Sequence, residues 1–489
     1  MCRFFLLGSF LALVALSVGC AAFSRETIRS SSSFEEKSFL ASDLLPQGLA
    51  VGDVSSHGAL LWLRTDGPAS IQVEWAPVSM WERASKLASV VALASRTTYV
   101  TTTAEADYTL TIPLDGLSPS TRYRYHILSG SADQTGKQLA GKLAARGEFL
   151  TLPDEKTSAP VTFAWSGDLG GQGRCRQGAG GYPIFDVIQR QEIDFFLFLG
   201  DTVYGDNPCP SPPNEPGADF KATTLQTYRV RHRYQRGAAA LQRFLRTVPV
   251  YVVWDDHEVR DNFSGPFDEQ MPGGRQALRE YWPIASPDDD PNRMYRSIRY
   301  GADLELFILD TRQYRSRNED QDGPSKTMLG TAQLRWLLDG FRASTATWKV
   351  IVTSVPLSVV KGGVGNDGWG GEPNGTGFER ERQVIVDAIL GHKIKNVVFL
   401  AGDVHWVQAN AYDPDQDGII DFHEYMVGPL SARPGRMTAA SETLHPRRLI
   451  NESGYQNFGL IRVTKNTFEV TVVDEAGEKR FFHVVEARP

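Results

Sequence analysis

The stretch from Phe195 to Tyr204 reads FFLFLGDTVY, and it decides the fold class. Five consecutive apolar residues that run straight into Gly-Asp are typical of a strand that is buried on both faces and ends in a polar loop. Similar apolar runs alternate along the chain with segments of helical period; the runs are 161–165, 248–254, 304–309, 350–352 and 397–400, and the helical segments are 223–245, 331–341 and 379–390. This alternation predicts an α/β domain.

Four of these apolar runs end in clusters of polar side chains. The clusters are Asp168; Asp201 and Tyr204; Asp255, Asp256, His257 and Glu258 with Asn262 behind them; and Asp403 with His405. In open α/β sheets the loops at the carboxyl ends of the strands meet at one crevice, where ligands bind. A single Gly-Asp pair is a common turn, but four clusters at equivalent strand ends indicate a site that holds more than one metal ion.

The residue types divide the predicted ligands into two sets. A mixed nitrogen and oxygen set comprises Asp168, Asp201, Tyr204 and His405. An oxygen-only set comprises Asp201, Asp256 or Asn262, and Asp403. A phenolic oxygen favours ferric iron, whereas carboxylate and amide oxygens suit hard cations. We therefore predict Fe³⁺ and Ca²⁺ bridged by Asp201, with Mg²⁺ or Mn²⁺ as alternatives to calcium at the second position.

His257 lies between the carboxylates of the third cluster. Two neighbouring metal ions can clamp a phosphate ester and lower the pKa of a bound water, so we expect a metal-activated hydroxide to attack phosphorus. We predict that His257 stays outside the ligand shell and donates a hydrogen bond or proton to the ester oxygen. The alternative for His257 is a histidine that is simply buried in the core.

Six segments together carry a more specific signal: 166–170, 200–204, 254–258, 309–315, 328–336 and 402–405. They resemble the alkaline phosphatase D family of metallophosphoesterases, which also includes phosphodiesterases and phospholipase D-like enzymes. The resemblance implies iron and calcium as cofactors and the hydrolysis of phosphate monoesters or diesters. Purple-type relatives carry a histidine after the next-to-last strand, but Thr353-Ser354-Val355-Pro356 has none. The second metal position is therefore expected to lack nitrogen.

Residues 45–153 form a different region, with short strands, turn signals and no helical period. We predict an all-β sandwich of the immunoglobulin or fibronectin type III kind. The segment 117–125 resembles the corner of such sandwiches, where a Tyr hydroxyl bonds to nearby backbone. The fold class is thus an α/β (α+β sandwich) metallophosphoesterase domain, at 158–489, preceded by this all-β domain.

The first 22 residues predict a secretory signal, because Arg3 precedes an apolar run and then small residues. Residues 16–20 also resemble a lipobox, in which Cys20 would carry a lipid anchor; cleavage near Ala22 without lipid is the alternative. The serine-rich residues 23–44 are predicted to be a flexible tether. We expect an exported protein that is periplasmic, held at the cell surface as a lipoprotein, or secreted.

Two cysteines remain behind the signal, Cys175 and Cys209, and both follow predicted metal-site motifs. In an oxidising compartment such a pair predicts a disulfide, which would brace the rim of the site. The alternative is a thiolate that binds metal.

The segment 413–424 matches the calcium loop of an EF-hand, with ligand positions at Asp413, Asp415, Asp417, Ile419 and Glu424. Two predicted strands flank it in place of two helices. We therefore predict a hairpin tip that holds a structural calcium ion, with a solvated acidic turn as the alternative.

The net charge of −7 and the lack of a basic stripe argue against nucleic-acid binding. The expected substrate is a small phosphate ester or a phospholipid. Three functions stay open at this stage: an alkaline phosphatase, a phosphodiesterase or phospholipase D-type enzyme, and a lipid-anchored surface binding protein that retains the fold. The glycine-rich residues 361–377, as a lid or as a plain surface loop, are expected to influence the choice between monoesters and diesters.

Overall fold

The computed structural model describes residues 43–84, 94–130, 141–178, 180–360, 365–371, 375–438 and 441–489. The predicted signal at 1–22, Cys20 and nearly all of the predicted tether lie outside these residues. Within the described part of the chain, every helix is too short or too polar to cross a membrane.

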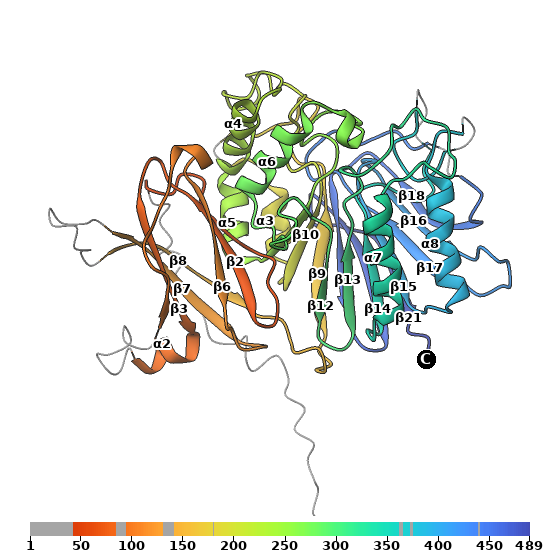
Figure 1. The fold of residues 1–489 in the computed structure, drawn as a ribbon, viewed down its shortest axis with the longest axis horizontal. Helices are drawn as coiled ribbons and strands as arrows, with labels where there is room; N and C mark the ends of the chain where they lie inside the picture. The colour runs from red at the N-terminus through yellow and green to blue at the C-terminus, as the bar shows by residue number, and fades with distance from the viewer. Residues whose placement is uncertain are drawn as a thin grey trace, which may run out of the picture. The chain divides into compact units, whose positions relative to one another are not determined.

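The first of two large sheets has nine strands and contains the sequence that predicted the fold (Figure 1). In spatial order they are β21 (Lys479–Glu486), β20 (Thr467–Asp474), β19 (Asn457–Val463), β9 (Val161–Ser166), β10 (Phe195–Leu199), β11 (Val250–Val253), β1 (Leu49–Gly52), β2 (Gly58–Arg64) and β6 (Thr109–Asp115). The central strands β9, β10 and β11 are parallel, so their carboxyl ends lie at one edge. The predicted tail hairpins pair with β9 through β19.

The second large sheet has seven strands. In spatial order they are β12 (Arg296–Tyr300), β13 (Leu304–Ile308), β14 (Trp348–Val352), β15 (Val397–Ala401), β17 (Phe422–Met426), β16 (Val407–Tyr412) and β18 (Pro446–Glu452). Strands β13, β14, β15 and β17 are parallel to one another. The two sheets pack face to face, because residues of both, such as Trp165 and Leu400, belong to one buried apolar cluster.

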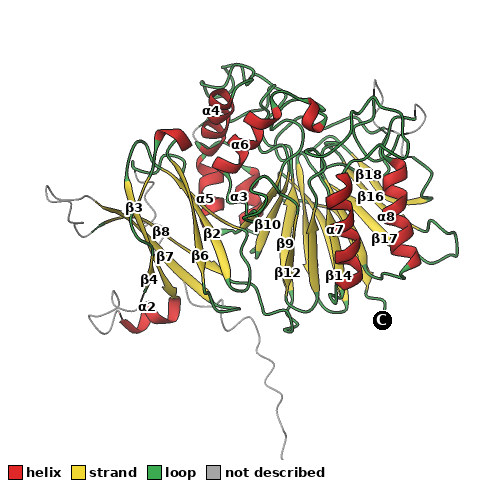
Figure 2. Cartoon of the chain, in the orientation of Figure 1, coloured by secondary structure: helices red, strands yellow, loops and turns green. Residues whose placement is uncertain are grey.

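Helices cover the outer faces of both sheets (Figure 2). Helices α3 (Ile184–Gln189) and α5 (Ala239–Thr247) pack on the first sheet, where the ring of Phe244 lies 5.5 Å from that of Phe196. Helices α7 (Gly330–Ala343) and α8 (Glu379–Gly391) share an apolar cluster with the second sheet. Each central strand is therefore buried by a sheet on one side and helices on the other, which explains its continuous apolar sequence.

The predicted helix at 223–245 is two helices. It divides into α4 (Leu225–Arg236) and α5, and the break lies at Gly237 and Ala238. A Cβ atom on Gly237 would lie 2.0 Å from a guanidinium nitrogen of Arg176, so glycine lets that side chain pack against the end of α4. Helix α4 packs beside α6 (Met271–Tyr281), and the short turn η4 (Gly265–Phe267) precedes α6.

Residues 45–153 divide between two sheets. Strands β1, β2 and β6 belong to the nine-stranded sheet, and the remaining strands form a separate sheet of β3 (Ser70–Pro77), β4 (Ser95–Arg96), β5 (Val100–Thr101), β7 (Arg122–Gly130) and β8 (Lys142–Leu150). Two short helices accompany them, α2 (Val78–Ala84) and η3 (Ala104–Ala106). The predicted corner contact is confirmed, because the Tyr123 hydroxyl accepts a hydrogen bond from the Ser118 N–H at 2.9 Å.

The core continues across the predicted domain boundary. The Arg236 guanidinium lies between the rings of Trp62, at 4.0 Å, and Trp282, at 4.2 Å, and the side chain is almost fully buried. Burial lowers the pKa of Arg236 to about 9. The indole of Trp62 also donates to the Glu280 carbonyl. Residues 45–153 thus share their core with the region that follows them, and the finer likeness to an immunoglobulin or fibronectin type III domain stays a prediction.

Strand β19 passes directly over Trp165, and a Cβ atom on Gly459 would lie 1.9 Å from the indole ring. We expect Gly459→Ala to lower the free energy of unfolding by about 1–3 kcal/mol, because the added methyl overpacks a closed core. Urea denaturation followed by circular dichroism measures the change. Gly391→Ala, at the end of α8 with open space around it, is the control. Equal stability of the two variants would contradict this packing.

Candidate metal centre

The loops that follow β9, β10, β11 and β15 meet at one edge of the two sheets, as the sequence predicts. A cavity of about 340 Å³ opens there, and its walls include Asp201, Asp256, His257, Asp403 and His405. Asp168 lies beside His405, with 3.1 Å between Asp168 Oδ1 and the His405 Nε2 atom. The four strand ends therefore bring the predicted residues together.

Three sets of ligand atoms at this edge lie close enough to hold a cation. In each set the atoms lie within 4.8 Å of one another; the sets are Asp168, Asp201 and His405; Asp201, Asp256 and His257; and Asp255, Asp256 and Asp403. Asp201 belongs to two of them, which is the arrangement required of a bridging carboxylate.

Tyr204 and His405 complete the first set. The Tyr204 hydroxyl lies 2.8 Å from His405 Nε2. His405 Nδ1 lies 2.7 Å from the Arg433 carbonyl, to which a protonated Nδ1 donates. This hydrogen bond leaves Nε2 facing Tyr204 and Asp168, the orientation that metal-binding histidines receive from their backbone partners.

Four of these residues have a left-handed backbone. The φ angles are 65° at Asp168, 50° at Asp201, 70° at Asp403 and 61° at His405. Non-glycine residues pay a steric penalty there, although Asp, Asn and His tolerate the region better than most. Each sharp turn directs a side chain from a strand end into the cavity. The strain is therefore concentrated where the ligands are.

The Asp256 carboxylate, and not the Asn262 side chain, faces the other ligand atoms of the second set. Asp256 is 2% exposed and belongs to two of the sets. Asn262 is exposed; its amide donates to Asp261, and its backbone N–H donates to Asp256 Oδ2 at 2.6 Å. Asn262 thus positions Asp256, and the geometry favours Asp256 as the ligand.

His257 is held by a carboxylate that the sequence analysis missed. Its Nδ1 lies 2.7 Å from Asp206 Oδ1, and its ring stacks on Tyr204 at 4.1 Å. Burial opposes a charge on His257, but Asp256 and Asp206 outweigh it and raise the pKa of the imidazole to about 10. Asp206 follows Tyr204 by two residues, and no motif marks it as a partner of His257.

Glu258 links two of the loops through buried hydrogen bonds. It is fully buried and accepts hydrogen bonds from the backbone N–H groups of Asp201, Thr202 and Asp255, and from the Thr202 hydroxyl. The carboxylate is thus fully used by the protein. Glu258 positions the loops after β10 and β11 and does not face a metal.

Asp255 is held by a buried arginine. Arg312 Nε donates to Asp255 at 2.6 Å, and the two outer nitrogens of Arg312 form a bidentate pair with Asp367 at 2.5 and 2.7 Å. Arg315 donates to the same Asp367 carboxylate at 2.8 Å. Asp367 lies in the described part of the glycine-rich segment, 365–371, and is 2% exposed. Residues 365–371 are therefore anchored to the site by the ion pairs of Asp367 with Arg312 and Arg315.

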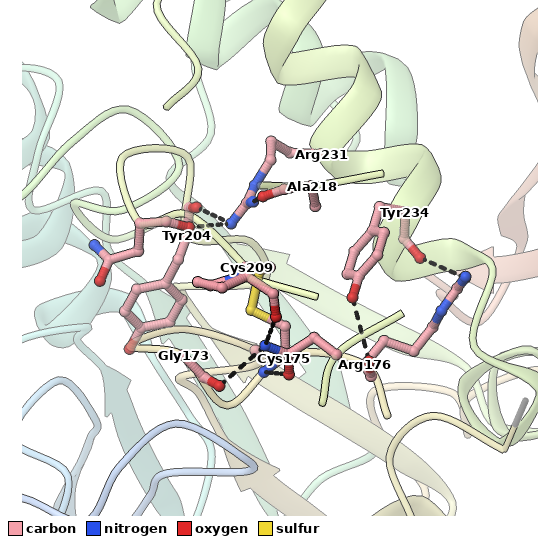
Figure 3. Close-up of a disulfide and its surroundings, with 12 residues drawn as sticks. Gly173, Cys175, Arg176, Tyr204, Cys209, Ala218, Arg231 and Tyr234 are labelled. Carbon is pink, nitrogen blue, oxygen red and sulfur yellow. Dashed lines mark hydrogen bonds between the residues drawn. A yellow bond between two sulfur atoms is a disulfide. The ribbon is translucent and has the colours of Figure 1, made fainter. Parts of the chain in front are cut away.

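A disulfide joins the loops after β9 and β10 (Figure 3). It links Cys175 to Cys209, so neither sulfur is available as a thiolate ligand. Arg231 reinforces the second loop, because its guanidinium donates to the carbonyls of Tyr204 and Asn207. The cross-link therefore braces the backbone that carries Tyr204.

The predicted calcium loop is the tip of the hairpin between β16 and β17, as expected. Asp413 accepts from the N–H groups of Asp417 and Gly418, and Asp417 accepts from that of Ile419. The prediction that Glu424 is the last ligand is wrong. Glu424 lies inside β17, is fully buried, and accepts hydrogen bonds from Tyr412 and Asn410.

Asp421 takes the place predicted for Glu424. The carboxylates of Asp413, Asp415 and Asp421 lie within 4.8 Å of one another. The difference arises because residues 422–426 form a strand and not a helix, and the alternation of β17 turns Glu424 inward.

The donor set of the main cavity fits bound cations. Asp168 is 1% exposed, and its Oδ2 atom has no hydrogen-bond partner within the part of the chain that the structure describes. Burial, followed by repulsion from Asp256, Asp255, Glu258 and Asp168, raises the pKa of Asp201 well above its usual range. Buried carboxylates of this kind are stable when they coordinate metal ions.

Comparisons with known proteins agree with this geometry. Residues 163–473 match the family described as PhoD-like phosphatase, and residues 30–153 match the PhoD-like phosphatase N-terminal domain. The chain is 28% identical over 323 residues to alkaline phosphatase D of Bacillus subtilis (strain 168), an alignment that covers 60% of this chain and 52% of that protein. The chain thus spans about half the length of this curated relative.

Two solved structures share the fold. The structure of PhoD has a TM-score of 0.71 and 22% identity, and the match covers 92% of this chain and 94% of that one. The purple acid phosphatase PPD1 from yellow lupin (Lupinus luteus) seeds has a TM-score of 0.60 and 13% identity, and covers 90% of this chain and 73% of that one. The family resemblance predicted from the motifs is confirmed, and the N-terminal match is to that family's own N-terminal domain.

Glu258→Gln tests whether Glu258 holds together the loops after β10 and β11. The glutamine keeps the volume but loses acceptor capacity, so buried N–H groups are left unsatisfied. Relief of repulsion with Asp201 offsets part of this loss. We expect the free energy of unfolding to fall by about 2–3 kcal/mol in urea denaturation. Glu475→Gln, in an exposed turn, is the control; a Glu258→Gln variant as stable as that control would contradict the assignment.

Proposed function

Because this chain belongs to the PhoD-like phosphatase family, we propose that it is a metal-dependent hydrolase of phosphate esters. One observation carries the proposal: carboxylates from four strand ends lie together with Tyr204 and His405 in and beside one cavity, and Asp168 Oδ2 has no partner among the described residues. Apolar and polar protein interiors alike disfavour such a concentration of like charge unless cations bind there.

We propose that the mixed set, which comprises Asp168, Asp201, Tyr204 and His405, holds ferric iron. Asp201 and Asp256, which share one set, and Asp403, which shares another set with Asp256, would hold calcium, with Mg²⁺ or Mn²⁺ as alternatives. When bound, such a pair of ions supplies Lewis-acid chemistry, which lowers the pKa of water and neutralises charge on the phosphoryl oxygens.

The remaining residues handle the proton and the geometry. His257 faces the cavity and, held by Asp206 at Nδ1, keeps its other nitrogen, Nε2, for the leaving oxygen of the ester. Proton donation to that oxygen makes it a better leaving group. Stacking on Tyr204 fixes the plane of the imidazole. Asp206 and Tyr204 thus position the proton that His257 donates.

Hydrolysis of p-nitrophenyl phosphate and bis(p-nitrophenyl) phosphate tests the proposed activity. We expect the purified full chain, loaded with iron and calcium, to release p-nitrophenol, and a chelator to abolish the release until both metals are restored. The double variant Asp168→Asn, Asp201→Asn serves as the inactive control. If the loaded protein hydrolyses neither ester, nor a phospholipid, then it is a binding protein that retains the fold.

His257→Gln separates proton donation from a structural role. A nitrophenolate leaves without help from an acid, whereas an alkoxide does not. We expect kcat for an alkyl phosphate to fall on the order of a hundredfold or more, and that for p-nitrophenyl phosphate to fall by less than about tenfold. Asp206→Asn should show the same leaving-group dependence in weaker form. Equal losses on both substrates would contradict proton donation by His257.

We also propose that the protein works outside the cytoplasm, as a periplasmic, surface-anchored or secreted enzyme. The Cys175–Cys209 disulfide supports this location, because such cross-links persist in oxidising compartments. The apolar leader at 1–22 agrees with it. Mass spectrometry of the mature N-terminus distinguishes a lipid on Cys20 from plain cleavage near Ala22, and an intact Met1 in an extract of the cytoplasm would contradict export.

A further inference from the structure

Arg433 is the one lysine or arginine among the described residues that line the cavity. The side chain is exposed, and its guanidinium makes no hydrogen bond or ion pair with a described residue. The other ionisable side chains on the wall are the four carboxylates of Asp201, Asp256, Asp261 and Asp403 and the two imidazoles. An exposed guanidinium thus lies on the wall of a cavity that is rich in carboxylates.

The backbone of Arg433 is fixed to residues of the metal centre. Its carbonyl accepts from His405 Nδ1 at 2.7 Å, and its N–H donates to the Gln172 side chain at 3.2 Å. The neighbouring N–H of Ala432 donates to the Asp168 carbonyl, and that of Gly435 donates to the His405 carbonyl. The backbone of Arg433 therefore has a fixed position relative to Asp168 and His405.

The guanidinium lies over the glycine-rich loop that follows β9. A Cβ atom on Gly173 would lie 3.7 Å from Arg433 Nη2, an ordinary van der Waals distance, so the guanidinium lies beside this loop. Gly173 also has a positive φ of 79°, which glycine adopts without strain. The hydrogen-bonded backbone and the exposed side chain on the cavity wall together allow the guanidinium to reach a ligand in the cavity without rearrangement of the loops.

We propose that Arg433 binds a non-bridging phosphate oxygen of the substrate and makes the enzyme prefer phosphate monoesters over diesters. This inference rests on the proposed function. Above about pH 7 a monoester carries two negative charges and a diester carries one. A guanidinium near the phosphate therefore stabilises the monoester more. A diester also replaces one acceptor oxygen with an ester group, which cannot form the charged pair.

An arginine on the surface has a plainer role as a solvated charge, and such charges contribute little. The rest of the same loop offers a matched comparison, because Arg436 is also exposed and does not line the cavity. Loss of Arg436 removes the same charge from the loop without removing it from the phosphate. The pair Arg433→Ala and Arg436→Ala thus separates contact from general electrostatic attraction.

The experiment measures kcat/KM for p-nitrophenyl phosphate and for bis(p-nitrophenyl) phosphate with the metal-loaded full chain. The two esters share a leaving group and differ in charge. We expect wild type to favour the monoester. For Arg433→Ala, kcat/KM on the monoester should fall on the order of tenfold to a hundredfold, and that on the diester by no more than about threefold. Arg433→Lys should recover part of the loss, because the charge remains.

Inhibition by inorganic phosphate provides a second readout that does not depend on the ester. The inhibition constant should rise about tenfold or more in Arg433→Ala and stay at the wild-type value in Arg436→Ala. Thermal melting checks that both variants fold. If wild type hydrolyses neither ester, the proposed function fails and the inference falls with it. If wild type is active but Arg433→Ala leaves both the ester ratio and the phosphate constant unchanged, the inference alone is overturned.

Discussion

The rest of the structure depends on the cost of burying several like charges at one point. Asp168, Asp201, Asp255 and Asp256 are each at most 2% exposed, and none is far from the next. The protein compensates part of this charge itself, with Arg312 on Asp255 and with backbone N–H groups on Glu258. It leaves the first set, around Asp168, without a cation of its own. This difference in protein partners separates the carboxylates that anchor the loops from those that could bind a metal ion.

Two facing sheets with helices outside are a direct means of building such a site. Parallel strands deliver their carboxyl ends to one edge, and the buried apolar sequence keeps those ends rigid. The left-handed turns at Asp168, Asp201 and Asp403 then aim the side chains inward. The loop from Gly428 to Gly435 connects the two sheets' contributions, because it hydrogen-bonds to both Asp168 and His405.

The strands and the convergence of the candidate ligands could be predicted from the sequence because each depends on local order: an apolar run, then a polar cluster such as Gly-Asp. The supporting residues could not. Asp206, Asp367 and Arg312 act through contacts between segments distant along the chain, and no local pattern identifies such partners. The error at Glu424 is of the opposite kind, because there a local pattern predicted a ligand that the fold excludes. It satisfies the spacing of a calcium loop, but the strand that begins at Phe422 turns it into the core. The division of residues 45–153 between two sheets was likewise decided by pairing with β11.

The end of β14 clarifies the difference between the two metal positions. The sequence there has Thr353 and Ser354 where purple-type relatives are expected to carry histidine. Both hydroxyl side chains are buried, and Ser354 shares a hydrogen bond with Thr311 at 2.5 Å. This pair belongs to the protein's own hydrogen-bond network and adds no nitrogen ligand. Asp201, Asp256 and Asp403 are the oxygen donors proposed for that position, and oxygen donors suit hard ions such as calcium. The proposed assignment of iron to the set with His405 leaves His257, the nitrogen donor of the second set, outside the ligand shell.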